Sequence, residues 1–225
     1  KRVMAEEKLR DMKCRRGILK FNRTLVMGIL NVTPDSFSDG KLFLNPDKAI
    51  NHAKQMVKDG ADIIDVGGES SRPGSGPVSE SEELRRVMQI IRKLSKDINV
   101  PISIDTYKPK VAEECIKLGA SIINDISGLR NREMINVAAK YKVPVIVMHM
   151  KGTPKTMQRN PRYTDVVKEI RQFLSQQIKR AKKAGIKDII IDPGIGFGKT
   201  AEHNLSILNN LERFKGLKCP ILIGP

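Results

Sequence analysis

The side chains of this sequence that could do chemistry stand where short apolar runs end. Asp65, Asp105, Asn124 and Asp192 each interrupt an isoleucine-rich run, in four different parts of the chain. Any one of them alone could equally cap a helix or begin a turn. Aspartate and asparagine are poor strand formers, however, so the same interruption in four runs favours one shared polar pocket over coincidence. Carboxylates and amides in such a pocket would offer a ligand a fixed set of hydrogen-bond partners.

Two longer polar segments extend this pattern. The segment MGILNVTPDSFSDG (27–40) begins like a buried strand, but from Asn31 onward it consists mainly of hydroxyl, amide and carboxylate side chains around a proline. The run that contains Asp65 continues into Glu69, Ser71 and Arg72. Both segments are typical of binding loops attached to the ends of scaffold strands.

The glycine-rich segment DPGIGFGKT (192–200) is not a nucleotide phosphate loop. The pattern G-x-x-x-x-G-K-[ST] needs a glycine five positions before Gly198, where this sequence has Pro193. Lys199 likewise occupies the last glycine position of G-x-G-x-x-G. We expect these glycines to let the backbone approach a flat ligand, with Phe197 as its side wall.

The histidines and cysteines do not suggest a zinc site. His52, His149 and His203 lack the spacing of metal ligands, and the three cysteines form no C-x-x-C pair. His149 follows an apolar run and could donate or accept a hydrogen bond in the pocket, or act as a base. An odd number of widely separated cysteines also disfavours a disulfide framework, so we expect a cytoplasmic protein.

The elements that must position these residues alternate along the chain. The apolar runs are mostly unbroken, which is typical of strands covered on both faces of a parallel sheet. Helix-period segments separate them, for example one after Ser79, one from Lys108 to Gly119 and one from Asp165 to Gly185. The strand candidates are residues 24–30, 61–68, 101–105, 121–126, 144–150, 188–194 and 219–224.

This alternation predicts either an open doubly wound α/β sheet or a closed (β/α)₈ TIM barrel. The chain of 225 residues has the length of one barrel. Because the seventh strand candidate lies at the end of the sequence, we expect a TIM barrel that lacks its last strand and helices. Residues 24–225 would form this domain, and residues 1–23 would form a basic N-terminal extension or a lid under the barrel floor. The strand ends of a barrel meet in one mouth, where active sites lie.

The net charge of the chain indicates which classes of partner it could bind. It has 41 Lys and Arg against 25 Asp and Glu, a formal net charge of +16. This excess attracts anions, but it is scattered along helical segments and is accompanied by no groove-reading motif, so we expect no nucleic-acid partner. A phosphorylated small-molecule substrate fits it better. No apolar run approaches the roughly 18 residues that cross a bilayer, and the first residues lack a signal-peptide stretch, so we expect neither a membrane partner nor secretion.

Six segments together resemble the dihydropteroate synthase family. In chain order they are MGILNVTPDSFSDG, GADIIDVGGESSRPG, SIDT, IINDISG, VMHMKGTP and IIIDPGIGFGK. The resemblance implies a (β/α)₈ barrel that acts in folate synthesis as a transferase of a pterinylmethyl group. Such an enzyme joins 6-hydroxymethyl-7,8-dihydropterin diphosphate to p-aminobenzoate and releases diphosphate.

The resemblance also implies a pterin site. Asp105, Asn124 and Asp192 would pair with the donors and acceptors on the amino-pyrimidinone edge of the pterin, and Asp65 would assist at the floor. Following the family pattern, Met148 and Phe197 would sandwich the ring. Met148 can also be interpreted as plain core packing.

A magnesium site and a diphosphate site follow from the same resemblance. Mg²⁺ would neutralise the departing diphosphate, with Asn31 as its single strong protein contact. Ser71 and Arg72 would hold the diphosphate and the carboxylate of the acceptor. Ser71 departs from the usual threonine of the family but keeps the hydroxyl group.

The remaining roles concern the acceptor and the catalytic step. Phe37 and Pro73 would shape the acceptor pocket, and Asp35 would stabilise the cationic pterin. Asp35 and Arg72 are therefore the expected catalytic residues. We also expect a homodimer.

Three other interpretations remain open. Pterin-binding methyltransferase barrels use similar Asp/Asn/Asp sets with methyl-tetrahydrofolate, although their first loop differs from NVTPDSFSDG. A synthase with a larger arylamine acceptor, as in methanopterin synthesis, would keep the motifs found here. The charge alone would also suit a non-catalytic basic binding module.

Overall fold

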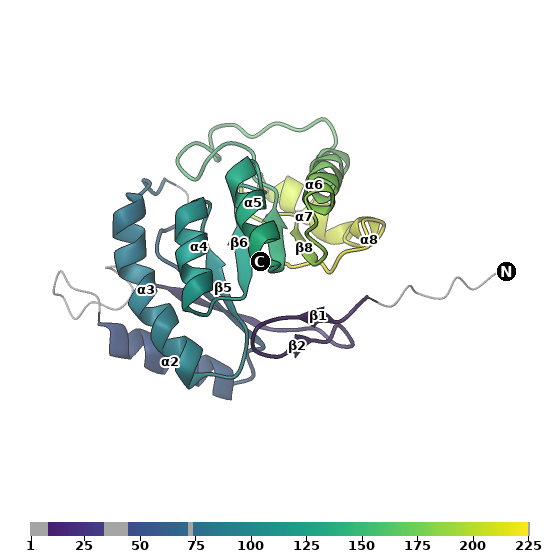
Figure 1. The fold of residues 1–225 in the computed structure, drawn as a ribbon. Coiled ribbons are helices and arrows are strands. Elements are labelled where there is room, and N and C mark those ends of the chain that lie inside the picture. The colour runs from purple at the N-terminus through teal and green to yellow at the C-terminus, as the bar shows by residue number, and fades with distance from the viewer. Residues whose placement is uncertain (1–8, 34–44, 72–73, 225) are drawn as a thin grey trace.

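The structure is a computed structural model and describes residues 9–33, 45–71 and 74–224 (Figure 1). Its centre is a parallel sheet with the strand order β3-β4-β5-β6-β7-β8. The strands are β3 (Met27–Asn31), β4 (Ile63–Gly67), β5 (Ile102–Asp105), β6 (Ile122–Asp125), β7 (Val145–Met148) and β8 (Ile189–Asp192). The helices are α2 (Pro46–Lys58), α3 (Glu80–Asp97), α4 (Pro109–Leu118), α5 (Arg132–Tyr141), α6 (Val166–Lys183), α7 (Ala201–Asn209) and α8 (Glu212–Lys215).

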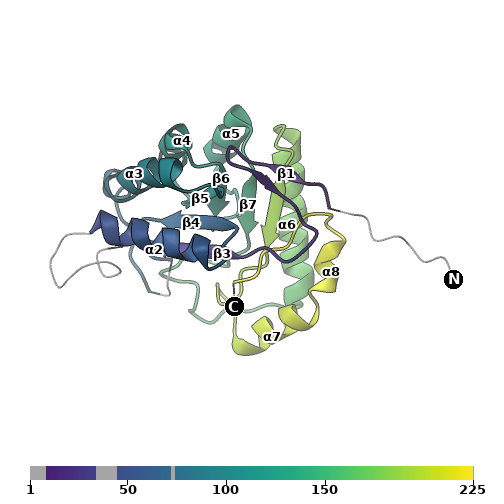
Figure 2. The ribbon, with the colours of Figure 1, turned by 90° about the horizontal axis from the view of Figure 1, so that it is seen from below.

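The strand order distinguishes the two predicted architectures. A doubly wound sheet reverses its strand order at a switch point, whereas these strands are neighbours in chain order, as in a barrel. Helices α2 to α6 follow one another in an arc outside the sheet (Figure 2). The predicted α/β class, a TIM barrel, is confirmed.

Alternation along the strands gives the sheet two different faces. Residues of one parity, such as Ile64, Ile104 and Val147, are fully buried in the main core, which they share with residues of the surrounding helices. Residues of the other parity point to the inside of the barrel. Because both faces are covered along most of the sheet, the strands are unbroken apolar runs.

A short antiparallel hairpin covers the amino-terminal end of the sheet. It consists of β1 (Met12–Lys13) and β2 (Ile18–Leu19). Met12 and Leu19 pack against inward-facing residues near the starts of four strands, namely Ile63, Ile122, Ile146 and Ile190. Figure 2 shows the hairpin lying across this end of the sheet. The floor is thus closed, and the carboxyl ends of the strands remain to form a site.

Local signals in the sequence explain where the helices begin. Ser79 caps α3 by accepting a hydrogen bond from the Glu82 N–H, and Asp165 caps α6 by accepting one from the Lys168 N–H.

The seventh strand candidate forms only an isolated parallel bridge, between Ile191 and Ile221. In the part of the chain that the structure describes, no helix is both long enough and apolar enough to cross a membrane.

Candidate active site

The predicted polar residues gather on the inward face at the carboxyl end of the sheet. Residues paired across parallel strands point to the same face, and Gly67 pairs with Asp105, which pairs with Asn124. On the next strands Met148 pairs with Asp192. The predicted site residues that share this face are Asn31, Asp65, Asp105, Asn124, Met148 and Asp192.

Asp65 and Asn124 are joined directly. Asn124 Nδ2 donates a hydrogen bond to Asp65 Oδ2 at 3.0 Å. Asp65 is only 4% exposed, and hydrogen bonds from the side chains of Ser103 and Asn124 partly offset the rise in its pKa that burial causes. Asp65 and Ser103 are thus buried polar residues on the inward face, below the carboxyl ends of the strands.

Burial changes the acidity of the aspartates in the pocket. It raises the pKa of Asp65 to about 6 and that of Asp192 to about 6. The pKa of Asp105 is raised well above its ordinary value, first by burial and then by the negative charge of Asp65. A ligand that donates N–H groups to these carboxylates would favour their ionised forms. These carboxylates are therefore suited to a heterocycle with several donors.

Gly67 leaves space for two side chains from neighbouring strands. A Cβ atom at Gly67 would lie 3.4 Å from Asp105 Oδ2 and 3.7 Å from Asn31 Oδ1. Asn31 and Asp105 therefore converge above this glycine. Asn31 is exposed, so its amide is accessible from the mouth of the barrel.

An apolar cluster borders the polar row, which is the set Asp65, Asp105, Asn124 and Asp192. Its buried members are Ile126, Met148, Met150 and Met157. Phe197 and Tyr107 are partly buried against it. Met148 is 3% exposed, which fits core packing as well as contact with a ligand, so its role stays a prediction. An apolar wall next to a few convergent polar groups is typical of a small-molecule site.

The segment after β8 turns sharply against β7. Asp192 Oδ1 accepts a hydrogen bond from the Gly194 N–H at 2.6 Å. Gly194 has φ +70°, and a Cβ atom there would lie 2.1 Å from the carbonyl oxygen of His149. The sequence predicted that the glycines allow close backbone approach. At Gly194 the backbone approaches another segment of the chain, and this contact holds Asp192 in place.

Lys199 is a buried lysine whose side chain bonds to the same segment. It is 3% exposed, and its Nζ donates to the carbonyl oxygens of Phe197 at 2.9 Å and His149 at 3.2 Å. Burial lowers the pKa of Lys199 to about 7. Burial, followed by the charge of Lys199, lowers the pKa of His149 to about 3. The His149 ring packs edge-on against Phe173, and the lowered pKa makes it a weak base at neutral pH.

The two predicted binding loops are described only in part. Ser71 is half-buried in the segment between β4 and α3. Asp35, Phe37, Arg72 and Pro73 lie outside the described residues, and their roles remain predictions.

Three residues near the carboxyl ends of the strands have no role that was predicted from the sequence: Glu69, Lys108 and Lys199. Glu69 follows β4 by two residues, and Lys108 follows β5 by three residues. Their positions after strand ends were a usable signal. Several of their hydrogen-bond partners, such as Glu83 for Lys108 and His149 for Lys199, are distant in the chain, and no local pattern reveals them.

The comparison with family models defines the class of the protein. Residues 27–225 match the family model described as pterin binding enzyme. This range includes all six strands of the parallel sheet and the polar row at their carboxyl ends. Fold and site together define a pterin-binding enzyme.

Individual relatives narrow this class. The chain is 53% identical over 214 residues to dihydropteroate synthase of Clostridium beijerinckii, covering 92% of this chain and 77% of that protein. Yersinia pestis dihydropteroate synthase, solved with a sulfonamide drug, has a TM-score of 0.90 and 44% identity, covering 96% of this chain and 79% of the other. The Xanthomonas albilineans enzyme, solved with 7,8-dihydropteroate, has a TM-score of 0.85 and 40% identity, covering 96% and 77%. The chain belongs to the dihydropteroate synthase family.

Proposed function

We propose that this protein is a dihydropteroate synthase. It transfers the pterinylmethyl group of 6-hydroxymethyl-7,8-dihydropterin diphosphate to p-aminobenzoate and releases diphosphate. The observation that carries the proposal is the row formed by Asp65, Asp105, Asn124 and Asp192 at one barrel mouth. The Xanthomonas albilineans relative was solved with 7,8-dihydropteroate, the product of this reaction.

The polar row suits the amino-pyrimidinone edge of a pterin. That edge presents N–H donors beside carbonyl and ring-nitrogen acceptors. The carboxylates of Asp105 and Asp192 accept from the donors. Asn124 uses one amide hydrogen on Asp65, which fixes the orientation of the amide and leaves its remaining donor and acceptor for the ring. Asp65 thus acts on the pterin through Asn124.

The transfer needs no strong base from the protein. The bond between the pterin methylene carbon and the diphosphate oxygen breaks, and the positive charge that develops is conjugated with the pterin ring. The arylamine nitrogen then forms a bond to this carbon and loses a proton. Carboxylates fixed around the ring stabilise the charge electrostatically. The low pKa of His149 agrees with a mechanism that uses no histidine base.

We propose Asn31 as the protein ligand of Mg²⁺. Within residues 9–33, 45–71 and 74–224 no cluster of three or more His, Cys, Asp or Glu side chains could hold a metal ion. An exposed amide oxygen fits a cation that is held by water, by substrate phosphates and by one or two protein atoms. Bound there, Mg²⁺ would neutralise the charge of the leaving diphosphate.

The residues around the second substrate are proposed from the family resemblance. Ser71 and Arg72 hold the diphosphate and the acceptor carboxylate, and Asp35 stabilises the cationic pterin. Phe37 and Pro73 line the acceptor pocket. A homodimer is proposed on the same basis. A cytoplasmic location is proposed from the free thiols of Cys14, Cys115 and Cys219, because a reducing compartment keeps cysteines unpaired.

Diphosphate release tests the proposed function against its alternatives. The purified protein is incubated with the dihydropterin diphosphate and Mg²⁺, with p-aminobenzoate, with a larger arylamine, or with neither. A dihydropteroate synthase forms 7,8-dihydropteroate and diphosphate in equal amounts only when p-aminobenzoate is present. Turnover with the larger arylamine alone would favour a methanopterin-type synthase, and methyl transfer from methyl-tetrahydrofolate without diphosphate release would favour a methyltransferase.

A further inference from the structure

A charged cluster beside the pocket joins two loops that follow neighbouring strands. Glu69, after β4, accepts hydrogen bonds from the Tyr107 hydroxyl at 2.7 Å and from Lys108 Nζ at 2.5 Å, both after β5. The same carboxylate accepts from the backbone N–H of Val78 at 3.1 Å. The Glu69 side chain is 10% exposed and that of Lys108 is 14% exposed. These bonds are therefore well shielded from water.

The cluster closes the β4–α3 loop at its base. Glu69 begins this loop and Val78 stands at its end, so one carboxylate connects both ends. Ser71 follows Glu69 by two residues, and Tyr107 follows Asp105 by two residues. The Glu69–Tyr107 bond consequently fixes the start of the loop that carries Ser71 relative to Asp105 in the polar row.

Helix α3 fixes the other side of the cluster. Glu83 on α3 is 1% exposed at its side chain and accepts a second hydrogen bond from Lys108. Gly68 lies so close to α3 that a Cβ atom there would be 2.7 Å from Val87 Cγ1. Arg86 Nη1 donates to the Gly68 carbonyl oxygen at 2.8 Å. The loop therefore starts from a rigid base.

We propose that Glu69 is a positioning residue for Ser71, because its bonds to Tyr107, Lys108 and Val78 set the place of Ser71 relative to Asp105. The inference rests on the proposed synthase function. Lys108 neutralises two carboxylates that lie near Asp105, and both Glu69 and Glu83 contribute to the raised pKa of Asp105.

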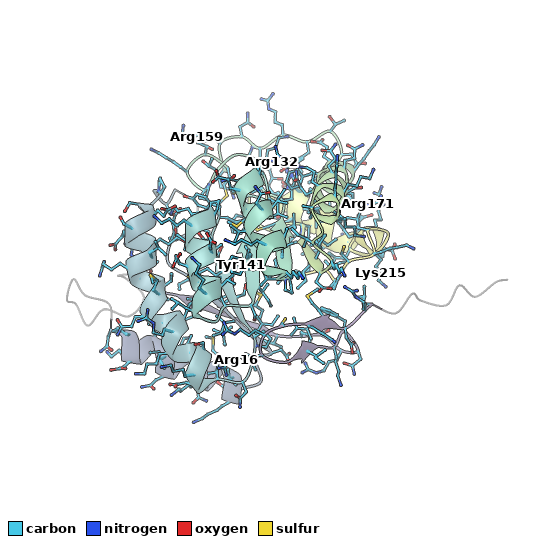
Figure 3. The ribbon with its side chains drawn as sticks, viewed as in Figure 1. Arg16, Arg132, Tyr141, Arg159, Arg171 and Lys215 are labelled. Atoms are coloured by element: carbon cyan, nitrogen blue, oxygen red, sulfur yellow. The ribbon has the colours of Figure 1, made fainter. Side chains whose placement is uncertain are left out.

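Glu113 offers a matched control elsewhere in the fold. Its carboxylate accepts hydrogen bonds from Tyr141 OH at 2.9 Å and from Lys140 Nζ at 2.8 Å, so it joins a tyrosine and a lysine as Glu69 does. This second cluster connects α4 to the last residues of α5, where Figure 3 labels Tyr141. Glu69→Ala and Glu113→Ala therefore remove the same kinds of bond, but only Glu69→Ala affects a loop at the mouth.

Steady-state kinetics and hydrogen exchange on both variants test the inference. In Glu69→Ala we expect KM for p-aminobenzoate and for the dihydropterin diphosphate to rise about tenfold, since the hydrogen bonds that hold the loop are lost. Affinity for 6-hydroxymethylpterin, which lacks the diphosphate, should stay as in the wild type. The backbone amides of residues 74–79 should exchange faster. Glu69→Gln, which keeps an acceptor oxygen, should recover most of the activity, and Glu113→Ala should change none of these quantities.

Each outcome has one meaning. Wild-type kinetics and unchanged exchange of residues 74–79 in Glu69→Ala would overturn the inference, and so would equal kinetic losses in Glu113→Ala. A wild-type protein that forms no dihydropteroate would count against the synthase function, while hydrogen exchange, which needs no substrate, still tests the loop contact. If Glu69→Ala does not fold, Tyr107→Phe is measured in the same way. It removes one hydroxyl and should raise the same KM values by a few fold.

Discussion

The amide of Asn124 on β6 donates a hydrogen bond of 3.0 Å to the carboxylate of Asp65 on β4, across the intervening strand β5. The two residues are 59 positions apart in the chain. The bond fixes which way the Asn124 amide faces, because the carboxylate can accept but not donate. A residue on the pocket floor thereby orients a residue that is proposed to contact the pterin.

We expect Asn124→Ala and Asp65→Ala to be energetically coupled. Removing the amide leaves a buried carboxylate without this donor, and removing the carboxylate frees the amide. A double-mutant cycle of unfolding free energies at neutral pH should give a coupling of about 1–3 kcal/mol. Strictly additive effects would show that the bond contributes nothing to stability.

The stability of the ligand-free protein should depend on the ionisation of Asp192. Its pKa is about 6 in the folded protein against 3.8 ordinarily. A raised pKa in the folded state stabilises the protein below the unfolded pKa, and this stabilisation is lost as pH rises through 6. Relative to Asp192→Asn, wild-type stability should fall as the pH rises from the ordinary pKa of 3.8 to the folded pKa of about 6. The fall should be at most about 3 kcal/mol. Urea unfolding of both proteins across the range measures it, and a pH-independent difference would contradict the assignment.

Asn31→Ala should lower turnover much more than it lowers pterin affinity. The amide is proposed to act on the metal and the leaving group, where charge neutralisation supplies several kcal/mol, so a loss of about tenfold or more is expected. Excess chelator should reproduce the loss in the wild type. Asn136→Ala, at an exposed position on α5, serves as the control. Full turnover in the presence of the chelator would refute the metal assignment.

Gly194→Ala should destabilise the protein more than Gly185→Ala does. Both glycines have positive φ, +70° and +91°, so alanine is strained at either position. At Gly194 the new Cβ would also lie 2.1 Å from the His149 carbonyl oxygen, whereas at Gly185 it would meet nothing within 4 Å. The loss at Gly194 should exceed about 1 kcal/mol. Denaturant titrations decide this, and equal losses would mean that the β8–α7 segment relaxes freely.

The fold could be predicted from the sequence because its signals are local. Unbroken isoleucine-rich runs separated by amphipathic segments are enough to place β4 to β8 and the major helices. The polar row was also predictable, since Asp105 and Asp192 are the last residues of their strands and parallel strand ends meet. The strand order, which establishes the barrel, required the structure.

Other features depend on contacts that no local pattern carries. A lid under the barrel floor was one of the two roles predicted for residues 1–23, but their weak periodicity did not reveal that Met12 and Leu19 are the residues that pack there. In the sequence, Lys199 was noted only because it replaces the last glycine of a G-x-G-x-x-G pattern. Its structural role depends on the carbonyl oxygens of Phe197 and of the distant His149, to which its amine donates. Glu69 was visible as a polar residue after a strand, but its pairing with Tyr107 depends on the packing of two loops.

The central claim is that the inward-facing carboxylates recognise the pterin, and calorimetric titration of 6-hydroxymethylpterin into the wild type and Asp105→Asn tests it most directly. Replacing the carboxylate by an amide leaves a donor of the buried ligand unpaired, so affinity should fall about tenfold or more. Asp165→Asn is the control, because asparagine can still cap α6 and the residue lies outside the polar row. Its affinity should equal that of the wild type. Equal affinity in Asp105→Asn as well would place the pterin elsewhere and contradict the account.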